Sequence, residues 1–396
     1  MLIGIVGKPS TGKSTFFKAV TLAEAETANY PFTTIKANHA VGYTKIDCVD
    51  KEFGKQCNPR IGYCIKGKRF VNVDLLDVAG LVPGASEGAG MGNQFLDDLN
   101  QANALVHVID ISGSTNEKGE AVDAGSYDPV NDIRFLEREL DYWYLRIIKK
   151  GWDKFARQIK QEQKEAYKAV SKQLSGLRVT EDIAKATLKE LNFPDNLETW
   201  TDEQILKLAS TLREKTKPMT IAANKIDVPV GKANFERVKK EFPNYTIIPC
   251  SAESELALKE AAKKELIDYV PGEKEVSIKG DLNEQQTKAI NFIKSNIIDN
   301  YGSTGVQDVI DTVVFKVLKK IAIFPGGVNK LEDKDGNVLP DCFLLDEGDT
   351  ALDFAFKLHT DIGKGFIRAI DVKTKRTVGK DHILKHRDIV EIITKA

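Results

Sequence analysis

The chain has almost no net charge and no long apolar run. It carries 57 lysine and arginine residues against 58 aspartate and glutamate residues, a net charge of −1 at pH 7, so no global charge attracts it to nucleic acid or to a membrane. No apolar stretch is long enough to span a bilayer, and the apolar start at residues 2–6 is too short for a signal peptide. We therefore expect a cytoplasmic protein that does not contact membranes.

Cysteine is also scarce. The odd number and the scatter of the five cysteines favour reduced thiols over disulfides. They are Cys48, Cys57, Cys64, Cys250 and Cys342. Cys57 and Cys64 could be half of a metal site, but the sequence offers neither a second close pair nor a neighbouring histidine to complete it. The sequence therefore does not predict a metal site there.

What the chain does contain is an ordered series of motifs within 396 residues, a length sufficient for two or three domains. The first is GKPSTGKS at 7–14, between an apolar run and a predicted helix at 13–22, which is the context that a phosphate-binding loop requires. In such a loop the backbone N–H groups approach phosphate oxygens, the lysine reaches the β- and γ-phosphates, and the hydroxyl that follows binds Mg²⁺. The predicted nucleotide contacts are Gly7, Pro9, Ser10, Thr11, Gly12, Lys13, Ser14 and Thr15.

Two further segments complete the predicted phosphate and Mg²⁺ site. In the proline-containing loop after the first helix, Thr34, or failing it Thr33, can bind Mg²⁺ while a γ-phosphate is present. A predicted strand at 69–77 ends at Asp77, which can hold Mg²⁺ through water, and Gly80 can donate its N–H to the γ-phosphate. This Asp-to-Gly pattern is strong evidence for a phosphate site when it lies one strand after a phosphate loop, because both strand ends then converge on the same phosphates. The predicted metal ligands are Ser14, Thr34 and Asp77, and the predicted catalytic groups are Lys13, Thr34 and Gly80.

The sequence offers no convincing group to position the attacking water. Leu81 stands where Ras-like GTPases carry a glutamine for this purpose, and leucine cannot hydrogen-bond water. Four glycines follow between positions 84 and 92, which indicates either a segment ordered by nucleotide or a plain flexible loop. We therefore expect slow hydrolysis unless another group or a partner completes the site.

The motif that discriminates between bases is NKID, Asn224 to Asp227, at the end of a predicted strand at 218–223. The Asp227 carboxylate can accept hydrogen bonds from both N1–H and the N2 amino group of guanine. Adenine offers no such donor pair, which would cost roughly 1–3 kcal/mol or more. Asn224 would contact the base edge or tie the loops together, and the Lys225 stem would cover the ring. After a further strand, Ser251 and Ala252 begin an SAE motif in which the Ala252 N–H could meet guanine O6.

Between residues 129 and 215 the spacing of apolar residues becomes helical, which predicts a helical insertion. Thr180 and Thr201 are typical helix starts. Basic residues recur from Lys149 to Lys172. They indicate either a basic face for RNA or a solvated helix surface, and the pattern alone favours the latter.

At this point the chain resembles the Obg and YchF superfamily of translation-factor-class GTPases. The resemblance rests on GKPSTGKST at 7–15, NYPFTTI at 29–35, DVAGLVPGASEGAGMGNQFLDDL at 77–99 and NKID at 224–227. Relatives commonly have asparagine at the position of Ser10, linked in some to potassium assistance, so the resemblance leaves that assistance open. YchF proteins usually replace NKxD and accept ATP, whereas this chain keeps Asp227. We therefore expect GTP and GDP as ligands, in a YchF-like relative of the archaeal or eukaryotic type.

The C-terminal region resembles a TGS domain. The resemblance rests on the stretch 339–370 and on DHILKHRDIVEII at 381–393. It implies a small ubiquitin-like sheet with one helix, for which we expect strands at 321–324, 368–374 and 389–393. Between Lys364 and Arg387 there are eight basic residues against two acidic ones, which fits contact with RNA phosphates.

The predicted fold is therefore α/β, a Ras-like P-loop domain with a helical insertion and a C-terminal β-grasp domain. The expected organisation is a GTPase domain in two segments (1–128 and 216–272), the insertion (129–215), a helical connection (273–320) and the TGS domain (321–396). The leading hypothesis is a Mg²⁺-dependent GTPase that acts as a switch on the ribosome or other RNA, contacted through the TGS domain and the insertion. The alternatives are a nucleotide-gated binding module with incidental hydrolysis and an ATPase of the YchF type.

Overall fold

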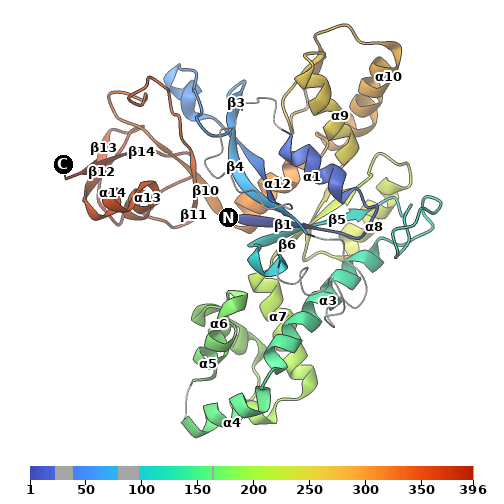
Figure 1. Cartoon of the computed structure of the whole chain (residues 1–396), viewed down its shortest axis with the longest axis vertical. Coiled ribbons are helices and arrows are strands. Elements are labelled where there is room, and N and C mark those ends of the chain that lie inside the picture. The colour runs from blue at the N-terminus through green and yellow to red at the C-terminus, as the bar shows by residue number, and fades with distance from the viewer. Residues whose placement is uncertain (23–38, 79–97, 163–164, 396) are drawn as a thin grey trace. The chain divides into compact units, whose positions relative to one another are not determined.

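Figure 1 shows the computed structural model of the chain, which describes residues 1–22, 39–78, 98–162 and 165–395. The described chain divides into two compact units, Met1–Phe17 with Leu75–Glu253 and Lys18–Asp74 with Ser254–Ala396. Strand β4 (Lys68–Asp77) begins in the second unit and ends in the first. This division does not follow the predicted domain borders, which stay predictions. Among the described residues, no helix combines the length and the apolarity that crossing a membrane requires.

The first unit is built on a parallel sheet with the strand order β4-β1-β5-β6-β7. The bounds of its other strands are β1 (Leu2–Val6), β5 (Ala104–Asp110), β6 (Met219–Asn224) and β7 (Thr246–Pro249). The registers pair Ile3 with Ala104 and Leu105 with Met219. Strands β5 and β6 are buried along their whole length, as parallel strands are when both faces of the sheet are covered. The predicted motifs follow the carboxyl ends of these strands and therefore meet at one edge.

The helical insertion lies within the first unit. Its helices are α3 (Val130–Lys149), α4 (Trp152–Glu162), α5 (Ala166–Gln173), α6 (Glu181–Leu191) and α7 (Asp202–Thr216). Helices α3 and α7 run side by side (Figure 1), and the Tyr144 and Thr216 hydroxyls share a buried hydrogen bond of 2.7 Å between them. Thr180 caps α6, and Thr201 forms a capping box at α7 with Gln204, so both predicted helix starts are confirmed. Helices α1 (Lys13–Thr21) and α8 (Gly231–Glu241) follow the phosphate loop and the NKID motif.

In the second unit, β2 (His39–Asp47) and β3 (Tyr63–Ile65) flank β4. A short 3₁₀ helix, η1 (Val49–Phe53), lies between β2 and β3. The remaining elements before the C-terminal sheet are α9 (Ala252–Lys263), β8 (Ile267–Tyr269), β9 (Val276–Ile278), α10 (Glu284–Ile293), α11 (Asp299–Tyr301) and α12 (Val306–Asp311). Helix α10 is capped by Asn283 and α12 continues as wider π-helical turns to Val317.

The C-terminal region forms a five-stranded sheet with the order β11-β10-β14-β12-β13. Its elements are β10 (Lys320–Pro325), β11 (Phe343–Asp346), α13 (Ala351–Leu358), α14 (Thr360–Lys364), β12 (Phe366–Asp371), β13 (Arg376–Val378) and β14 (Ile389–Thr394). Helix α13 packs against β12 and β14 over a core that includes Phe354 and Val390. The predicted β-grasp domain is therefore confirmed. The predicted strand at 368–374 is wrong at its end, because Thr374 donates to Asp371 and Lys375 takes a positive φ of 59°, which turns the chain.

Candidate nucleotide site

The carboxyl edge of the parallel sheet carries a cleft of about 510 Å³. Its lining comes from the phosphate loop, the NKID motif and the SAE motif, and consists of Lys8, Pro9, Ser10, Gly12, Lys13, Ser14, Thr15, Asn224, Lys225, Asp227, Val228, Ser251 and Glu253. Segments more than 200 residues apart in the sequence thus meet as predicted. The predicted residues Thr34 and Gly80 lie outside the described residues. Of the other predicted residues, Gly7, Thr11, Asp77 and Ala252 are not part of this lining.

Backbone geometry explains the two glycines of the phosphate loop. A Cβ atom on Gly7 would stand 2.5 Å from the Val108 carbonyl oxygen. Gly12 has a φ of +87°, and its Cβ would stand 2.2 Å from the Asn224 amide nitrogen. Both positions therefore exclude side chains, which keeps the loop open for phosphate at the start of α1.

The phosphate end of the cleft contains an ion pair between Lys13 and Asp77. The Lys13 side chain is 13% exposed and the Asp77 side chain 29% exposed. A phosphate would compete with Asp77 for the Lys13 ammonium group, and a divalent cation would compete with Lys13 for the Asp77 carboxylate. The oxygen donors of Ser14 and Asp77 are the hard ligands that Mg²⁺ prefers, so the residues present fit the predicted cation.

Asn224 ties the loops together, which is one of the two roles predicted for it. Its side-chain amide donates to the Thr11 carbonyl at 2.8 Å, and its Oδ1 accepts from the Ala252 N–H at 2.9 Å. The side chain is buried, so it fixes the phosphate loop to the SAE motif. Because Asn224 engages the Ala252 N–H, the predicted contact of that N–H with guanine O6 requires the hydrogen bond to be shared or exchanged.

Lys225 also has a partner that the sequence did not reveal. Its ammonium group binds the Asp110 carboxylate at 2.9 Å, so its side chain links the ends of β5 and β6. Asp110 is buried and accepts hydrogen bonds from Ser112, Ser114 and Thr115. Burial acts to raise the pKa of Asp110, but the hydrogen bonds from Ser112 and Ser114 and the Lys225 charge hold it below its usual range. A permanently charged Asp110 therefore holds Lys225 in place.

Asp227 presents its carboxylate to the same cleft. Among the residues that the structure describes, this carboxylate has no hydrogen-bond or ion-pair partner within the protein. Its charge acts on the buried Cys250 thiol, whose pKa is raised by burial and by the Asp227 charge. The carboxylate is thus available to two N–H donors of a ligand, which is the geometry expected for guanine recognition.

Lys8, the second residue of the phosphate loop, has a buried network of its own that the sequence did not predict. Its ammonium group donates to the Thr115 carbonyl at 3.0 Å, binds Asp132 at 2.9 Å and lies 3.7 Å from the centre of the Tyr127 ring. Asp132 belongs to α3, so Lys8 connects the phosphate loop to the first helix of the insertion. The only sequence signal would have been the lysine itself.

Three family comparisons agree with this geometry. Residues 2–137 match the family described as 50S ribosome-binding GTPase, residues 222–327 the Obg-like GTPase YGR210-like, G4 motif-containing domain, and residues 332–394 the TGS domain. A GTP-binding protein of Methanocaldococcus jannaschii is 48% identical over 100% of this chain and 99% of its own. The ribosome-binding ATPase YchF of Bacillus subtilis is 30% identical over 66% of this chain and 69% of its own.

A solved structure agrees as well. The crystal structure of a GTP-binding protein from Pyrococcus horikoshii OT3 covers 100% of both chains at 40% identity, with a TM-score of 0.77. The phosphate loop, the base-reading motif and the C-terminal β-grasp sheet all fall inside the matched regions. The chain belongs to the Obg-like, YchF-type family of P-loop GTPases with a C-terminal TGS domain.

Proposed function

We propose that the protein binds GTP with Mg²⁺ and hydrolyses it slowly to GDP and phosphate. The observation that carries the proposal is the Asp227 carboxylate, which lines the cleft without a protein hydrogen-bond partner among the described residues. An adenine base would leave this charge desolvated and unpaired, at a cost of roughly 1–3 kcal/mol. Guanine supplies two donors that satisfy it.

In the proposed reaction Lys13 exchanges Asp77 for the phosphate oxygens and stabilises the charge that develops on the transferred group. Asp77 and Ser14 would hold Mg²⁺, which supplies further charge stabilisation when it is bound. Asn224 and Lys225 keep the loops in place, since their hydrogen bonds end on Thr11 and Asp110. With leucine at position 81, we expect turnover to be slow without a partner, on the order of 10⁻⁴ s⁻¹ as in unassisted Ras.

We further propose that the ribosome or another RNA is the partner and that the TGS domain makes the contact. Of the eight basic residues between Lys364 and Arg387, two are engaged, because Lys373 and Arg387 both bind Glu52. The other six are exposed and have no ion pair within the described part of the chain: Lys364, Arg368, Lys375, Arg376, Lys380 and Lys385. Six exposed cations within one small domain are available to RNA phosphates.

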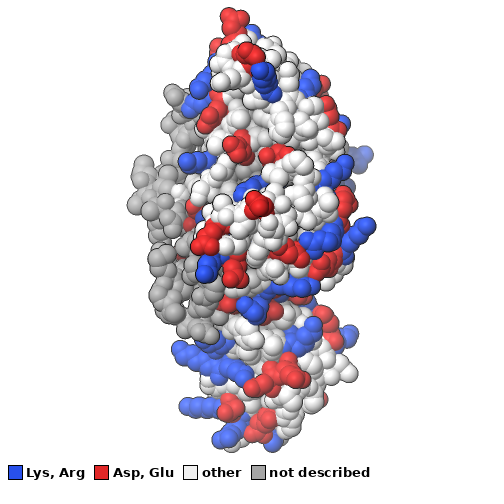
Figure 2. All heavy atoms as spheres, turned by 90° about the vertical axis from the view of Figure 1, so that its right-hand side faces the viewer, with Lys and Arg blue, Asp and Glu red and all other residues white. Residues whose placement is uncertain are grey.

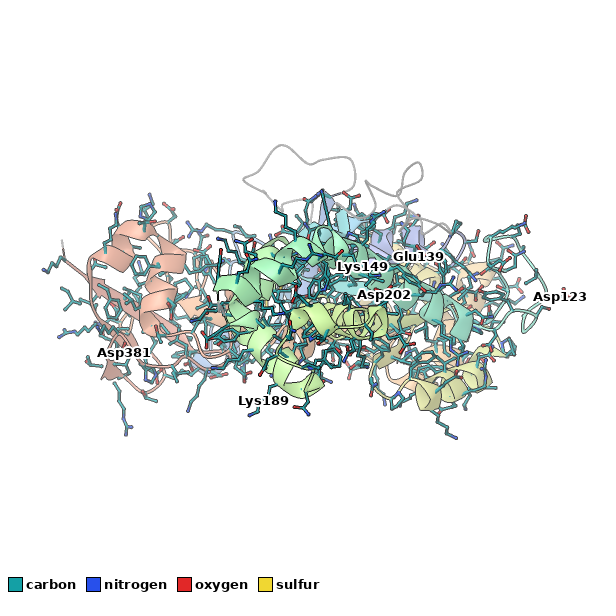
Figure 3. The ribbon with its side chains drawn as sticks, turned by 90° about the horizontal axis from the view of Figure 1, so that it is seen from below. Asp123, Glu139, Lys149, Lys189, Asp202 and Asp381 are labelled. Carbon is teal, nitrogen blue, oxygen red and sulfur yellow. The ribbon has the colours of Figure 1, made fainter. Side chains whose placement is uncertain are left out.

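The insertion supports this role less well. Several of its basic residues pair with acidic neighbours, as Lys160 does with Glu198 at 2.5 Å and Lys168 with Glu165 at 2.6 Å. Three others of the same run have no ion pair among the described residues: Lys150, Lys154 and Lys172. Figure 3 shows Lys149 beside Asp202, which it binds at 2.7 Å. Figure 2 shows basic and acidic side chains interspersed on the face that it presents. These pairings favour the solvated-surface interpretation of the insertion.

The test is GTP turnover by the full chain with and without purified ribosomes, at low and moderate salt. Strong stimulation would place the protein in translation and assign the missing catalytic group to the partner. Intact GTP binding without stimulation would favour a nucleotide-gated module or another activator. Fast turnover of the isolated protein would contradict the proposal that the site is incomplete alone.

ATP is the second candidate substrate, because relatives are named Ribosome-binding ATPase YchF and Obg-like ATPase 1. Equilibrium affinities for GTP and ATP, measured in competition against one fluorescent nucleotide, separate the two. We expect GTP to bind at least tenfold more tightly, which corresponds to about 1.4 kcal/mol. A preference for ATP would overturn the role given to Asp227.

A further inference from the structure

Three of the five cysteines meet at one point in the second unit. The side chains of Cys48, Asp50, Cys57 and Cys64 each offer one ligand atom, and these four atoms all lie within 4.8 Å of one another. The Cys48 and Cys57 sulfurs are 3.6 Å apart. The sequence alone brings Cys57 and Cys64 together and offers no second close pair. The structure supplies the missing partners from a segment that precedes them.

The fold of the segment between β2 and β4 produces this cluster. Cys48 comes directly after β2, Asp50 lies in η1, Cys57 follows in the loop, and Cys64 lies in β3. Asp50 holds the loop closed, because its Oδ2 accepts from the Cys57 N–H at 3.0 Å. Cys48 is held from the other side by donating its N–H to the Gly67 carbonyl at 2.8 Å. Backbone hydrogen bonds therefore position Cys48 and Cys57 on both sides of the cluster.

The spacing fits a tetrahedral metal ion better than a disulfide. Zinc binds thiolate sulfur at about 2.3 Å in tetrahedral sites, which places neighbouring sulfurs about 3.8 Å apart. The distance of 3.6 Å between Cys48 and Cys57 is close to this value, whereas a disulfide requires about 2.05 Å. A carboxylate oxygen is an accepted fourth ligand of zinc. Asp50 keeps a lone pair for this purpose, since each carboxylate oxygen can accept two hydrogen bonds.

The electrostatic surroundings favour an anionic centre. Arg69 is fully buried and donates only to the Leu339 and Pro340 carbonyls, at 3.1 and 2.9 Å. Within the described part of the chain no carboxylate pairs with it, and its Nε has no hydrogen bond. A buried unpaired cation is costly. Three thiolates and a carboxylate carry more negative charge than a divalent cation neutralises. A site holding the cation would therefore remain negative and offset the Arg69 charge.

We propose that Cys48, Cys57, Cys64 and Asp50 bind one zinc ion, or an equally thiophilic divalent cation, as a closed structural site. Soft sulfur ligands select such a metal over Mg²⁺ or Ca²⁺. Cys48, Asp50 and Cys57 are buried and Cys64 is partly buried, which suits a structural site with no position open to substrate. The ion would fasten η1 and its loop to β3.

The first experiment measures metal in the full chain, expressed without a histidine tag and purified under reducing conditions. Elemental analysis is expected to find one zinc per chain, and replacement with Co²⁺ is expected to give the intense visible bands of a tetrahedral thiolate site. Cys57→Ser should lose this metal. Cys250→Ser is the control, because it removes an equally buried thiol of the first unit and should keep one equivalent.

A second measurement covers the case in which Cys57→Ser does not fold. The wild-type chain is treated with a chelator, its melting temperature is measured, and Zn²⁺ is then titrated back. Chelation should lower the melting temperature and expose three further thiols to a thiol reagent, and stoichiometric Zn²⁺ should reverse both effects. A folded, chelator-treated protein that takes up neither Zn²⁺ nor Co²⁺ would overturn the proposal, as would a Cys48–Cys57 disulfide in protein purified under reducing conditions.

Discussion

Asn224 and Asp227 lie three residues apart and serve different purposes. Asn224 is buried, and its side chain hydrogen-bonds the Thr11 carbonyl and the Ala252 N–H. Asp227 lines the cleft and makes no hydrogen bond to any described residue. A side chain without protein partners in a cleft is available for the ligand, whereas one with two protein partners determines the shape of the cleft. The two residues therefore predict different mutant behaviour.

Asp227→Asn should weaken GTP binding by about tenfold to a hundredfold. The asparagine amide cannot accept hydrogen bonds from both guanine donors, and the lost interaction costs roughly 1–3 kcal/mol. Xanthosine triphosphate should bind the variant better than the wild type, since xanthine has a carbonyl where guanine has its amino group. Competition titrations with both nucleotides provide the measurement. Glu253→Gln is the control, as Glu253 also lines the cleft and should leave GTP affinity unchanged. Equal GTP affinity of Asp227→Asn and wild type would contradict the assignment.

Gly12→Ala should abolish nucleotide binding. The variant combines a strained positive φ of 87° with a Cβ placed 2.2 Å from the Asn224 amide, so Asn224 must move and release the phosphate loop. Gly151→Ala separates the two effects, because Gly151 has a φ of +79° and open space around its Cβ. Both variants should lose on the order of 1–3 kcal/mol of stability through backbone strain, measured by denaturant unfolding. Only Gly12→Ala should lose GTP affinity, and retention of that affinity would show that the contact with Asn224 is dispensable.

Some site residues could be predicted from sequence and others could not, for identifiable reasons. Lys13, Ser14 and Asp227 belong to short motifs whose residue types and spacing indicate their function directly. Asp110 sits at the end of a strand like Asp77, but no neighbouring motif marks it, and its role follows only from its distance to Lys225. The cysteine cluster was missed for the same reason, since eight residues separate Cys48 from Cys57 in the sequence.

At the level of elements, α12 is attached to β2 through the partly buried Asp311 carboxylate. Asp311 Oδ1 accepts from the Thr44 hydroxyl, the Lys45 N–H and the Gln307 amide at 2.7 to 2.9 Å. Burial nevertheless dominates and raises the pKa of Asp311 to about 6. The attachment therefore contains a carboxyl group that resists ionisation.

This pKa predicts a pH dependence of stability. The pKa of Asp311 in the folded state lies above its ordinary value of 3.8, so the folded state binds the proton more tightly than the unfolded state does. The stability of the folded state therefore falls as pH rises from 3.8 to about 6. A shift of about two pKa units corresponds to about 3 kcal/mol. Asp311→Asn keeps an oxygen for the three donors and removes the ionisation. The variant should therefore gain stability relative to wild type by up to this amount between pH 4 and pH 7.

The measurement is the free energy of unfolding of both proteins by denaturant at several pH values in that window. Asp381→Asn provides the control, since Asp381 is exposed (Figure 3) and its variant should follow the wild-type curve. A wild-type minus Asp311→Asn difference that stays constant with pH would show that Asp311 ionises normally.

The elements themselves were largely predictable. The helix caps at Thr180, Thr201 and Thr350 follow from residue type and are present. The end of β12 was misplaced because Val372 is apolar and buried and thus continues the strand pattern, while the turn depends on the Thr374–Asp371 hydrogen bond. Local propensity carries little information about such a contact.

At the scale of the whole molecule, a net charge of −1 hides an uneven distribution of charge. The stretch from Lys364 to Arg387 has six exposed basic residues without ion pairs among the described residues, while the insertion pairs several of its own, such as Lys149, Lys160 and Lys168. Unpaired surface cations release counterions when they meet RNA phosphates, and paired cations contribute less. We therefore propose that the TGS domain contacts RNA on the basis of the ion pairing of basic residues more than on the number of lysines.

The double variant Arg368→Glu/Arg376→Glu should accordingly weaken RNA binding in the full chain. The logarithm of the binding constant should also depend less steeply on the logarithm of the salt concentration, by roughly 0.7–0.9 for each phosphate contact removed. Lys160→Glu/Lys168→Glu makes the same charge change on two exposed insertion lysines that are ion-paired with Glu198 and Glu165, and it should have little effect. Binding of ribosomal RNA fragments, followed by fluorescence anisotropy between low and moderate salt, measures both quantities. If the insertion variant lost affinity and the TGS variant kept it, the RNA contact would belong to the insertion, and the pairing argument would be wrong.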